Sequence, residues 1–187
     1  MKRFVIAATG ASGAIYLQRL LHYLGREDCE LHLLFSEYAK QVVHQETGGI
    51  TLPPNATEYN LRSMNAPFVS GSTHFDAMIV CPCSMGTLAR IAAGTSDNAI
   101  LRAADVFLKE RRRLILVPRE TPFNRIHVRN LASVMDAGAD IVPAMPSFYS
   151  HPADFDALAD TVVWRILAHL DYHPAEAYRW KEAPAQE

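Results

Sequence analysis

An apolar run that ends in glycines and passes directly into a helical pattern is the feature that most limits how this chain can fold. Residues 4–8 are apolar, and the turn Gly10-Ala11-Ser12-Gly13 separates them from a segment with apolar residues at helical spacing. A strand that turns tightly into a helix places the first N–H groups of that helix, beside the close backbone of the glycines, where they can bind an anion. The opening therefore predicts a strand–turn–helix unit with a candidate anion site.

The spacing of the two glycines narrows the ligand class. Gly10 and Gly13 follow the pattern G-x-x-G, whereas dinucleotide-binding folds carry G-x-G-x-x-G and P-loops end in Lys followed by Ser or Thr. A mononucleotide or a simple phosphate therefore fits this turn better than a dinucleotide does. A turn without any ligand explains the motif about equally well, so the rest of the chain has to decide.

Apolar runs alternate with helical patterns along the whole chain. We expect strands at residues 4–8, 29–35, 77–81, 114–117 and 141–142, and helices at 14–24, 36–47, 84–93, 98–110, 122–137 and 154–170. Pro82 is expected to stop the third strand, and residues 48–75 are expected to form a long loop with one short strand near 68–69. This alternation predicts an α/β fold with a parallel sheet that helices cover on both faces.

Length and composition indicate a single globular domain over residues 1–187, with a polar tail after about residue 173. The net charge of −2 gives no basic footprint for nucleic acid, and no apolar run approaches the ~20 residues of a membrane span. The three cysteines and the lack of a signal-peptide pattern favour a reducing, cytoplasmic location. Cys81 and Cys83 have no second ligand pair at zinc spacing, so we expect buried thiols.

Each predicted strand is followed by small, polar or charged residues. Ligands of parallel α/β sheets bind beyond the carboxyl ends of the strands, so these residues are candidates for one shared site. They are the turn at 10–13, Ser36, the run Ser84-Met85-Gly86-Thr87, the pair Arg119-Glu120, and Tyr149. Ser36 and Ser84 can cap the helices that they precede, and for Ser84 capping alone is as good an explanation as an anion site.

Several charged residues lie at positions where they could bind an anion or act beside one. Arg119 supplies a fork of donors suited to phosphate or a ring carbonyl, and Glu120 can carry a proton, although a surface ion pair would look the same. Arg102 and Lys109 share one helix face. Arg165 lies within an otherwise apolar helix and needs a partner, for which a phosphate is suitable. Aspartate-rich diphosphate motifs and H-E-x-x-H do not occur in the sequence, so we expect the anion to be neutralised without a metal.

These segments together resemble one known family. The segments Gly10-Ala-Ser-Gly-Ala14, Cys81-Pro-Cys-Ser-Met-Gly-Thr87, Arg102-Ala-Ala-Asp105, Lys109-Glu-Arg111, Val117-Pro-Arg-Glu-Thr-Pro122 and Pro146-Ser-Phe-Tyr149 are similar to those of the UbiX-type flavin prenyltransferases. The resemblance extends from Phe4 to about Trp180. More distant relatives, the flavin-dependent cysteine decarboxylases, carry a PASANT-like segment and a catalytic histidine, and the corresponding helix start of this chain reads CPCSMGT.

The resemblance implies a Rossmann-like, flavodoxin-like three-layer fold that assembles into trimers and dodecamers, with FMN at the subunit interface. It implies transfer of a dimethylallyl group from dimethylallyl monophosphate to N5 and C6 of reduced FMN. The prenylated FMN would serve a UbiD-type decarboxylase in ubiquinone synthesis or aromatic-acid breakdown.

The resemblance also assigns roles to individual residues. FMN binding is implied for Gly10, Ala11, Ser12, Ser36, Ser84, Met85, Gly86, Thr87 and Arg119. Binding of the prenyl phosphate is implied for Lys109, Tyr149 and Arg165, with Arg102 contributing from a neighbouring subunit or from behind these contacts. Catalysis is implied for Ser12, Glu46 and Glu120 as proton carriers, together with Lys109, and Trp180 is implied to close the site from the tail.

Two other functions stay open on the sequence alone. One is an FMN-dependent oxidative decarboxylase that acts on cysteinyl substrates. The other is a subunit that stores or delivers flavin and performs no chemistry.

Overall fold

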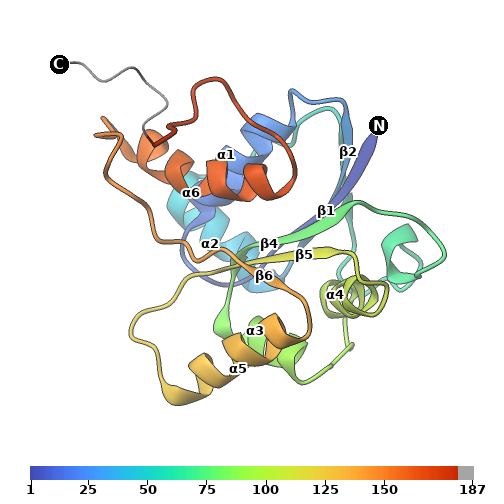
Figure 1. The fold of residues 1–187 in the computed structure, drawn as a ribbon. Coiled ribbons are helices and arrows are strands. Elements are labelled where there is room, and N and C mark those ends of the chain that lie inside the picture. Colours follow the sequence, from blue (N-terminus) through green and yellow to red (C-terminus); the bar gives the residue numbers. More distant parts are fainter. Residues whose placement is uncertain (181–187) are drawn as a thin grey trace.

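A single parallel sheet forms the centre of the protein in a computed structural model that describes residues 1–180. Its strands are β1 (Lys2–Ala8), β2 (Cys29–Phe35), β3 (Ala56–Tyr59), β4 (Ala77–Cys83), β5 (Arg113–Pro118) and β6 (Asp140–Ile141). They lie in the order β3-β2-β1-β4-β5-β6, and all neighbours pair in parallel (Figure 1). The chain winds outward in one direction as far as β3 and returns to start again at β4 beside β1. Such a switch point is where doubly wound sheets bind ligands.

Helices cover both faces of this sheet. They are α1 (Ala14–Leu24), α2 (Glu37–Thr47), α3 (Met85–Ala92), α4 (Ala99–Lys109), α5 (Arg125–Asp136) and α6 (Phe155–His169), with a short 3₁₀ helix η1 at Pro67–Val69. One apolar core contains residues of α1, α2 and α6, and the other contains residues of α3, α4 and α5. Figure 1 shows these two groups on opposite sides of the strands. The predicted three-layer α/β fold is therefore confirmed.

The apolar strands form because both of their faces are buried. Along β1, Phe4, Ile6 and Ala8 belong to one core, whereas Val5 and Ala7 belong to the other. All five side chains are at most 1% exposed. Full burial of a large apolar side chain stabilises the fold by about 1.5–3 kcal/mol, which is why a near-continuous apolar run rather than an alternating one marks a central parallel strand.

Three of the strand predictions are wrong. Residues 67–69 form the 3₁₀ helix η1, which begins at Pro67, while a strand that we did not expect pairs with the outer edge of β2 at Ala56–Tyr59. Its sequence, ATEY, is short and at most half-buried, so pairing with β2 is the main source of its strand conformation. Pro82 does not stop β4, because the pairing with β5 shifts register between Val80 and Cys83 and continues. Such an irregularity accommodates the missing N–H of a proline.

The predicted start of the fifth helix needs a small adjustment, and the predicted buried thiols are confirmed. Asn124 caps α5 through its side chain, so the helix starts at Arg125 and not at 122. Cys81 and Cys83 are free and fully buried, and burial raises the pKa of Cys83 to about 12. The tail after 173 continues without a helix or strand to Trp180, and its last part, 181–187, lies outside the described residues. Among the described helices, none is long and apolar enough to cross a membrane.

Candidate active site

The carboxyl ends of β1 and β4 meet at the switch point, and Thr9 joins them. The Thr9 N–H and hydroxyl both donate to Pro82 O at 3.1 Å, and the Thr9 hydroxyl oxygen accepts the N–H of Ser84 at 2.7 Å. Thr9 is 2% exposed. Sequence reasoning missed this residue, although a threonine that ends an otherwise apolar strand was the available signal. Thr9 fixes the turn at 10–13 relative to the start of α3.

Further contacts bring the ends of β2 and β5 to the same edge. Ser36 N donates to Ala8 O at 3.0 Å, so the start of α2 lies beside the end of β1. Arg119 Nε donates to Ser12 O at 3.1 Å, which directs this side chain across the switch point. The turn at 10–13, Ser36, Ser84 and Arg119, together with the residues around them, are called the rim site below. These strand-end residues converge as predicted, but Tyr149, which was predicted to lie with them, lines a separate cavity.

The start of α1 is not free to bind a ligand anion as the sequence suggested. Glu46, near the end of α2, accepts the N–H of Gly13 at 2.9 Å and that of Ala14 at 2.8 Å through the same carboxylate oxygen. Gly13 adopts a positive φ of 116°, and it offers no side chain to cap the helix. The carboxylate of Glu46 takes the place of that cap and interacts favourably with the positive end of the helix dipole. Glu46 therefore belongs to the rim site.

The surroundings of Glu46 keep it ionised. Partial burial acts to raise the pKa of Glu46, but hydrogen bonds from Ser12, Gly13 and Ala14 and the charge of Arg119 outweigh it, so the pKa lies below its usual value. The group is therefore a carboxylate at neutral pH, hydrogen-bonded to the Ser12 hydroxyl. A carboxylate in that position can accept a proton from the serine or through it.

Two other helix starts at the rim have the capping geometry that the sequence predicted. Ser36 Oγ accepts the N–H of Ala39 at 3.1 Å, and Ser84 Oγ accepts the N–H of Thr87 at 3.3 Å. The first N–H groups of a helix have no partner within that helix, so α2 and α3 each present donors at the rim. A Cβ added at Gly86 would meet nothing within 4 Å, so the start of α3 faces open space. This gap allows close approach of a ligand to its backbone.

Gly10 is required for another reason. A Cβ on Gly10 would lie 2.5 Å from Cβ of Tyr38, in the first turn of α2. A larger residue would therefore push α2 away from the turn and open the rim site.

Glu120, the other predicted proton carrier, is oriented differently. Its carboxylate accepts the N–H of Thr121 at 3.0 Å and so closes its own turn. In this arrangement Glu46 contacts the Ser12 segment directly, whereas Glu120 would have to rotate away from Thr121 to act on a ligand.

Tyr149, Arg165 and Trp180 line a second, separate site, which we call the α6 cavity. It has a volume of about 380 Å³, and its other lining residues are Ser147, Thr161, Trp164 and Tyr178. The rings of Tyr149 and Trp180 meet edge to face with centroids 5.1 Å apart. Among the described residues, none of the rim site lines this cavity. Trp180, which the resemblance implies to close the site, lies beside Tyr149 and Arg165, and within one chain these residues form a group of their own.

Arg102 and Lys109 form a third group on α4. Arg102 Nε donates to Val69 O at 3.1 Å, and Arg102 also pairs with Asp105 at 2.7 Å. Lys109 pairs with Glu110 and lies against Gly71, where an added Cβ would be 2.9 Å from Nζ. Because α4 ends at Lys109 and β5 begins at Arg113, Lys109 lies at the amino edge of the sheet, opposite Arg119. One chain by itself therefore does not bring Lys109 to the rim site.

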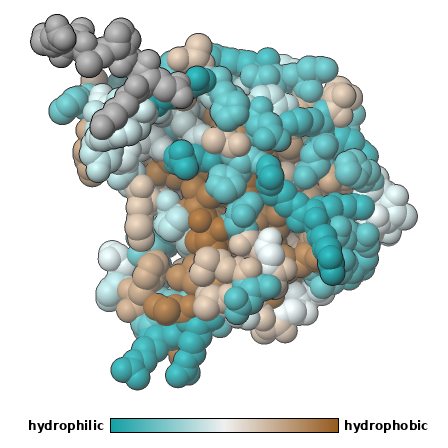
Figure 2. All heavy atoms as spheres, in the orientation of Figure 1, coloured by the Kyte–Doolittle hydropathy of each residue, from teal (hydrophilic) through white to brown (hydrophobic). Residues whose placement is uncertain are grey.

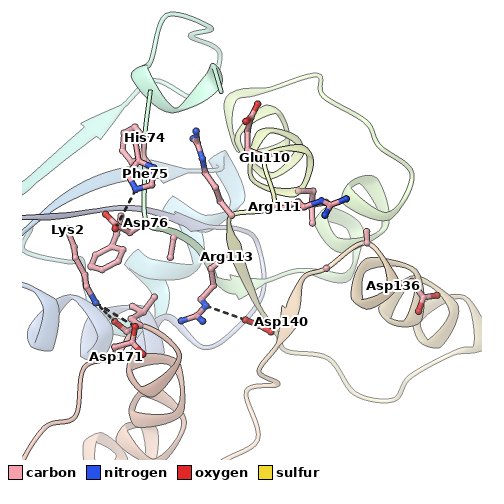
Figure 3. Close-up of a pocket in the computed structure, with 17 residues that line it drawn as sticks. Lys2, His74, Phe75, Asp76, Glu110, Arg111, Arg113, Asp136, Asp140 and Asp171 are labelled. Atoms are coloured by element: carbon pink, nitrogen blue, oxygen red, sulfur yellow. Dashed lines mark hydrogen bonds and ion pairs between the residues drawn. The ribbon is translucent and has the colours of Figure 1, made fainter. Parts of the chain in front are cut away.

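A larger open cavity of about 1140 Å³ also lies at the amino edge (Figure 3). Its charged side chains are largely paired with one another: Lys2 with Asp171 at 3.9 Å, Arg113 with Asp140 at 3.9 Å, and His74 with Asp76 at 3.7 Å. This cavity is larger than the α6 cavity, but its paired charges favour neither an anion nor a cation as ligand. The rim site is the better candidate because the starts of α2 and α3 and Arg119 converge there, although Glu46 already accepts the N–H groups at the start of α1.

The rim residues fit a flavin mononucleotide. The starts of α2 and α3 and Arg119 supply donors for a phosphate, and Ala11 and Met85 supply buried apolar surface beside them. The open space at Gly86 leaves room for a group at the backbone. Within residues 1–180, no group of three or more His, Cys, Asp or Glu side chains is placed to hold a metal ion.

The chain is similar to known proteins over nearly its whole length. The family model described as Flavoprotein matches residues 1–167. The flavin prenyltransferase UbiX of Pseudomonas aeruginosa is 44% identical over 97% of this chain and 95% of its own length. A solved structure described as AnUbiX (PadA1) in complex with FMN and dimethylallyl pyrophosphate is 43% identical, with a TM-score of 0.90 over 96% of this chain and 97% of that one.

A second solved structure, a dodecameric FMN-dependent UbiX-like decarboxylase from Escherichia coli O157:H7, is 40% identical, with a TM-score of 0.91 over 96% of this chain and 99% of that one. The fold, the rim site and similarity over nearly the whole length lead to one conclusion. The chain belongs to the flavoprotein family and, within it, to the UbiX-type flavin prenyltransferases.

Proposed function

We propose that this protein transfers a dimethylallyl group from dimethylallyl monophosphate to N5 and C6 of reduced FMN. The observation that carries the proposal is the rim site, where two capped helix starts, Arg119 and an ionised Glu46 converge at the switch point of the sheet. The full-length similarity to flavin prenyltransferases supports the same reaction. The prenylated FMN would then be released to a decarboxylase of the UbiD type.

The rim site would hold the flavin. We assign FMN binding to Gly10, Ala11, Ser12, Ser36, Ser84, Met85, Gly86, Thr87 and Arg119. Bound reduced FMN supplies the nucleophilic ring atoms of the reaction. Helix starts and serine hydroxyls suit its phosphate, and the guanidinium of Arg119 suits either the phosphate or a ring carbonyl.

The prenyl phosphate would be held where positive charge can meet a departing phosphate. The ester bond breaks to give an allylic cation and a phosphate dianion, so preorganised cations at the leaving oxygen lower the barrier. We assign this task to Lys109, Arg165 and Arg102, with Tyr149 as a hydrogen-bond donor. Ser12 and Glu46, with Glu120 after rotation, would move the protons that the flavin ring atoms lose.

These phosphate-binding residues would reach the rim site from neighbouring copies of the chain. Large apolar side chains are exposed along residues 123–155, namely Phe123, Ile126, Val128, Met135, Met145, Phe148, Tyr149 and Phe155. Figure 2 shows apolar surface gathered across the middle of one face of the molecule. A monomer rarely exposes so much, so this surface suits subunit contacts. The similar protein from Escherichia coli is dodecameric, and we propose the same assembly here.

Mass spectrometry of the flavin tests the proposal. Purified protein is incubated with reduced FMN and dimethylallyl monophosphate, and in parallel with the diphosphate. We expect a flavin heavier by one prenyl group, and the comparison identifies the preferred donor. A protein that releases carbon dioxide from a cysteinyl peptide and leaves the flavin unchanged would instead be the oxidative decarboxylase. Unchanged flavin without any decarboxylation would favour storage.

Arg165→Ala is expected to weaken use of the prenyl phosphate. Loss of a charge-assisted hydrogen bond to phosphate should raise KM for dimethylallyl monophosphate by about 10-fold or more, while FMN still binds. Steady-state kinetics and a flavin titration measure the two effects. Arg26→Ala, an exposed arginine beyond the end of α1, serves as the control. Equal KM values for the Arg165 variant and the unmodified protein would contradict the assignment.

Mixed oligomers test whether one site is shared between copies. Lys109→Ala and Glu46→Gln should each be nearly inactive alone. When the two variants are coexpressed with distinct tags and purified as mixed oligomers, about a quarter of the sites should combine an intact rim with an intact Lys109. Activity should therefore recover to about that fraction of the unmodified level. If each chain carried a complete site, mixing would restore nothing.

A further inference from the structure

A buried chain of polar groups connects α1 to α6, and we call it the α1–α6 polar chain. Asp160 is 5% exposed. Its two carboxylate oxygens accept hydrogen bonds from Nε and Nη2 of Arg19, each at 2.7 Å. The Tyr23 hydroxyl donates to Asp160 at 3.0 Å and accepts the indole N–H of Trp164, also at 3.0 Å. Arg19, Tyr23, Asp160 and Trp164 thus form one continuous hydrogen-bonded series.

The chemistry of the groups fixes the direction of this series. The Trp164 indole can only donate, and the Asp160 carboxylate can only accept. The Tyr23 hydroxyl must therefore direct its proton to Asp160 and its lone pair to Trp164. The hydrogen bonds to Asp160 raise the pKa of Arg19 further, so the arginine stays charged beside the carboxylate. Only one arrangement satisfies all four groups, and it specifies one orientation of the Trp164 ring.

That ring orientation matters because Trp164 lines the α6 cavity beside Arg165. The same helix also holds another part of the lining: the Thr161 hydroxyl oxygen accepts the N–H of Ser147 at 3.0 Å and so anchors the segment that leads to Tyr149. One rotation or shift of α6 against α1 would move both parts of the lining. An apolar contact between α1 and α6 would give comparable stability, since buried ion pairs often add little over apolar residues. Unlike an apolar contact, the polar chain allows only one orientation of α6 relative to α1.

We propose that Tyr23 and Asp160 are positioning residues for the phosphate-ester site. Through the Trp164 indole and the placement of α6, they set the distance between Arg165 and Tyr149 at which a monophosphate ester is bound. This inference rests on the proposed function, because it takes the α6 cavity to be the ester-binding part of the site.

The test is binding of dimethylallyl monophosphate to the assembled protein loaded with oxidised FMN, which cannot react. Calorimetry should give a dissociation constant about 5- to 10-fold higher for Tyr23→Phe, the effect of one lost hydrogen bond, and a similar value for Trp164→Phe. The double variant should be no weaker than either single variant, because both changes break the same link. Tyr172→Phe is the control: it removes a hydroxyl beyond the other end of α6, where the ring packs on Phe4 and under Lys2.

A second measurement separates positioning from loss of structure. The chain has two tryptophans, so Trp180→Phe leaves Trp164 as the sole indole fluorophore. Adding Tyr23→Phe to that background should change the emission maximum of Trp164, while flavin affinity and the thermal midpoint stay close to those of the Tyr172→Phe control. Unchanged ester affinity in Tyr23→Phe, or effects of Tyr23→Phe and Trp164→Phe that simply add, would overturn the inference.

The two proposals fail in different ways. If the unmodified protein binds the ester but makes no prenylated flavin, the proposed reaction is wrong, and the affinity ratios still decide the role of Tyr23. If prenylated flavin forms and Tyr23→Phe binds the ester as well as the unmodified protein does, only the positioning role is wrong.

Discussion

Glu46→Gln is expected to lower the rate of flavin prenylation by about 100-fold or more, the usual contribution of a positioned proton acceptor. The amide keeps the size of the side chain and can still accept from Gly13 and Ala14, so the start of α1 should stay in place. What disappears is the negative charge beside Ser12 and Arg119. Single-turnover rates with enzyme in excess measure the chemical step apart from product release.

The control for this variant lies on the same helix. Glu37 is an exposed residue in the first turn of α2, and Glu37→Gln should leave the rate within about twofold, as expected for a surface substitution away from the site. Flavin affinity should change little in either variant. A Glu46→Gln protein that prenylates flavin at the unmodified rate would remove Glu46 from the proposed mechanism and leave Glu120 as the remaining carboxylate.

The pH dependence follows from the lowered pKa of Glu46. A carboxyl group with a depressed pKa in the folded protein contributes stability that is fully present above its unfolded pKa and is lost as the pH falls through the folded value. The link between Glu46 and the start of α1 should therefore persist at neutral pH and down to a pH below the ordinary value of 4.5 for a glutamate. In Glu46→Gln this contribution to the acid dependence of stability should be absent.

Asp160→Ala is expected to produce the largest loss of stability, about 3–5 kcal/mol, because it leaves the largely buried Arg19 with only the exposed Asp156 as an ion-pair partner. Both partners are well removed from water, since the side chains of Arg19 and Asp160 are 17% and 7% exposed. Urea unfolding at a fixed protein concentration measures the change, with the concentration held constant because the assembly contributes to stability.

Asp156 provides a matched control for Asp160. It lies one turn earlier on α6 and pairs with the same Arg19 at 3.3 Å, but its side chain is 58% exposed. An exposed ion pair contributes about 0–1 kcal/mol, so Asp156→Ala should change the unfolding free energy by no more than that. Equal losses for the two variants would show that burial of Asp160 is not what makes the contact important.

The sequence alone was sufficient for features that depend on neighbouring residues. The apolar runs predicted the central strands, and Ser36 and Ser84 cap helices as predicted, because each is a polar residue at the beginning of a helical pattern. The strand-end rule also predicted the rim site, because parallel strands necessarily end at the same edge. Strand β3 was missed because its four residues carry no apolar signal and are ordered by pairing with β2.

Contacts between distant segments had to come from the tertiary structure. Glu46 reaches Gly13 across 33 positions, and Tyr23 reaches Asp160 across 137, so no local pattern reveals either pair. Lys109 is different, because a helix that ends just before a parallel strand ends at the amino edge of the sheet, so the predicted elements already separate Lys109 from Arg119. Local propensity determines where a strand or helix forms, because it acts through a few adjacent residues. Which side chains then meet depends on how the layers pack. In this protein, packing places the carboxylate of Glu46 at the start of α1 and separates the predicted site residues onto three surfaces of one chain.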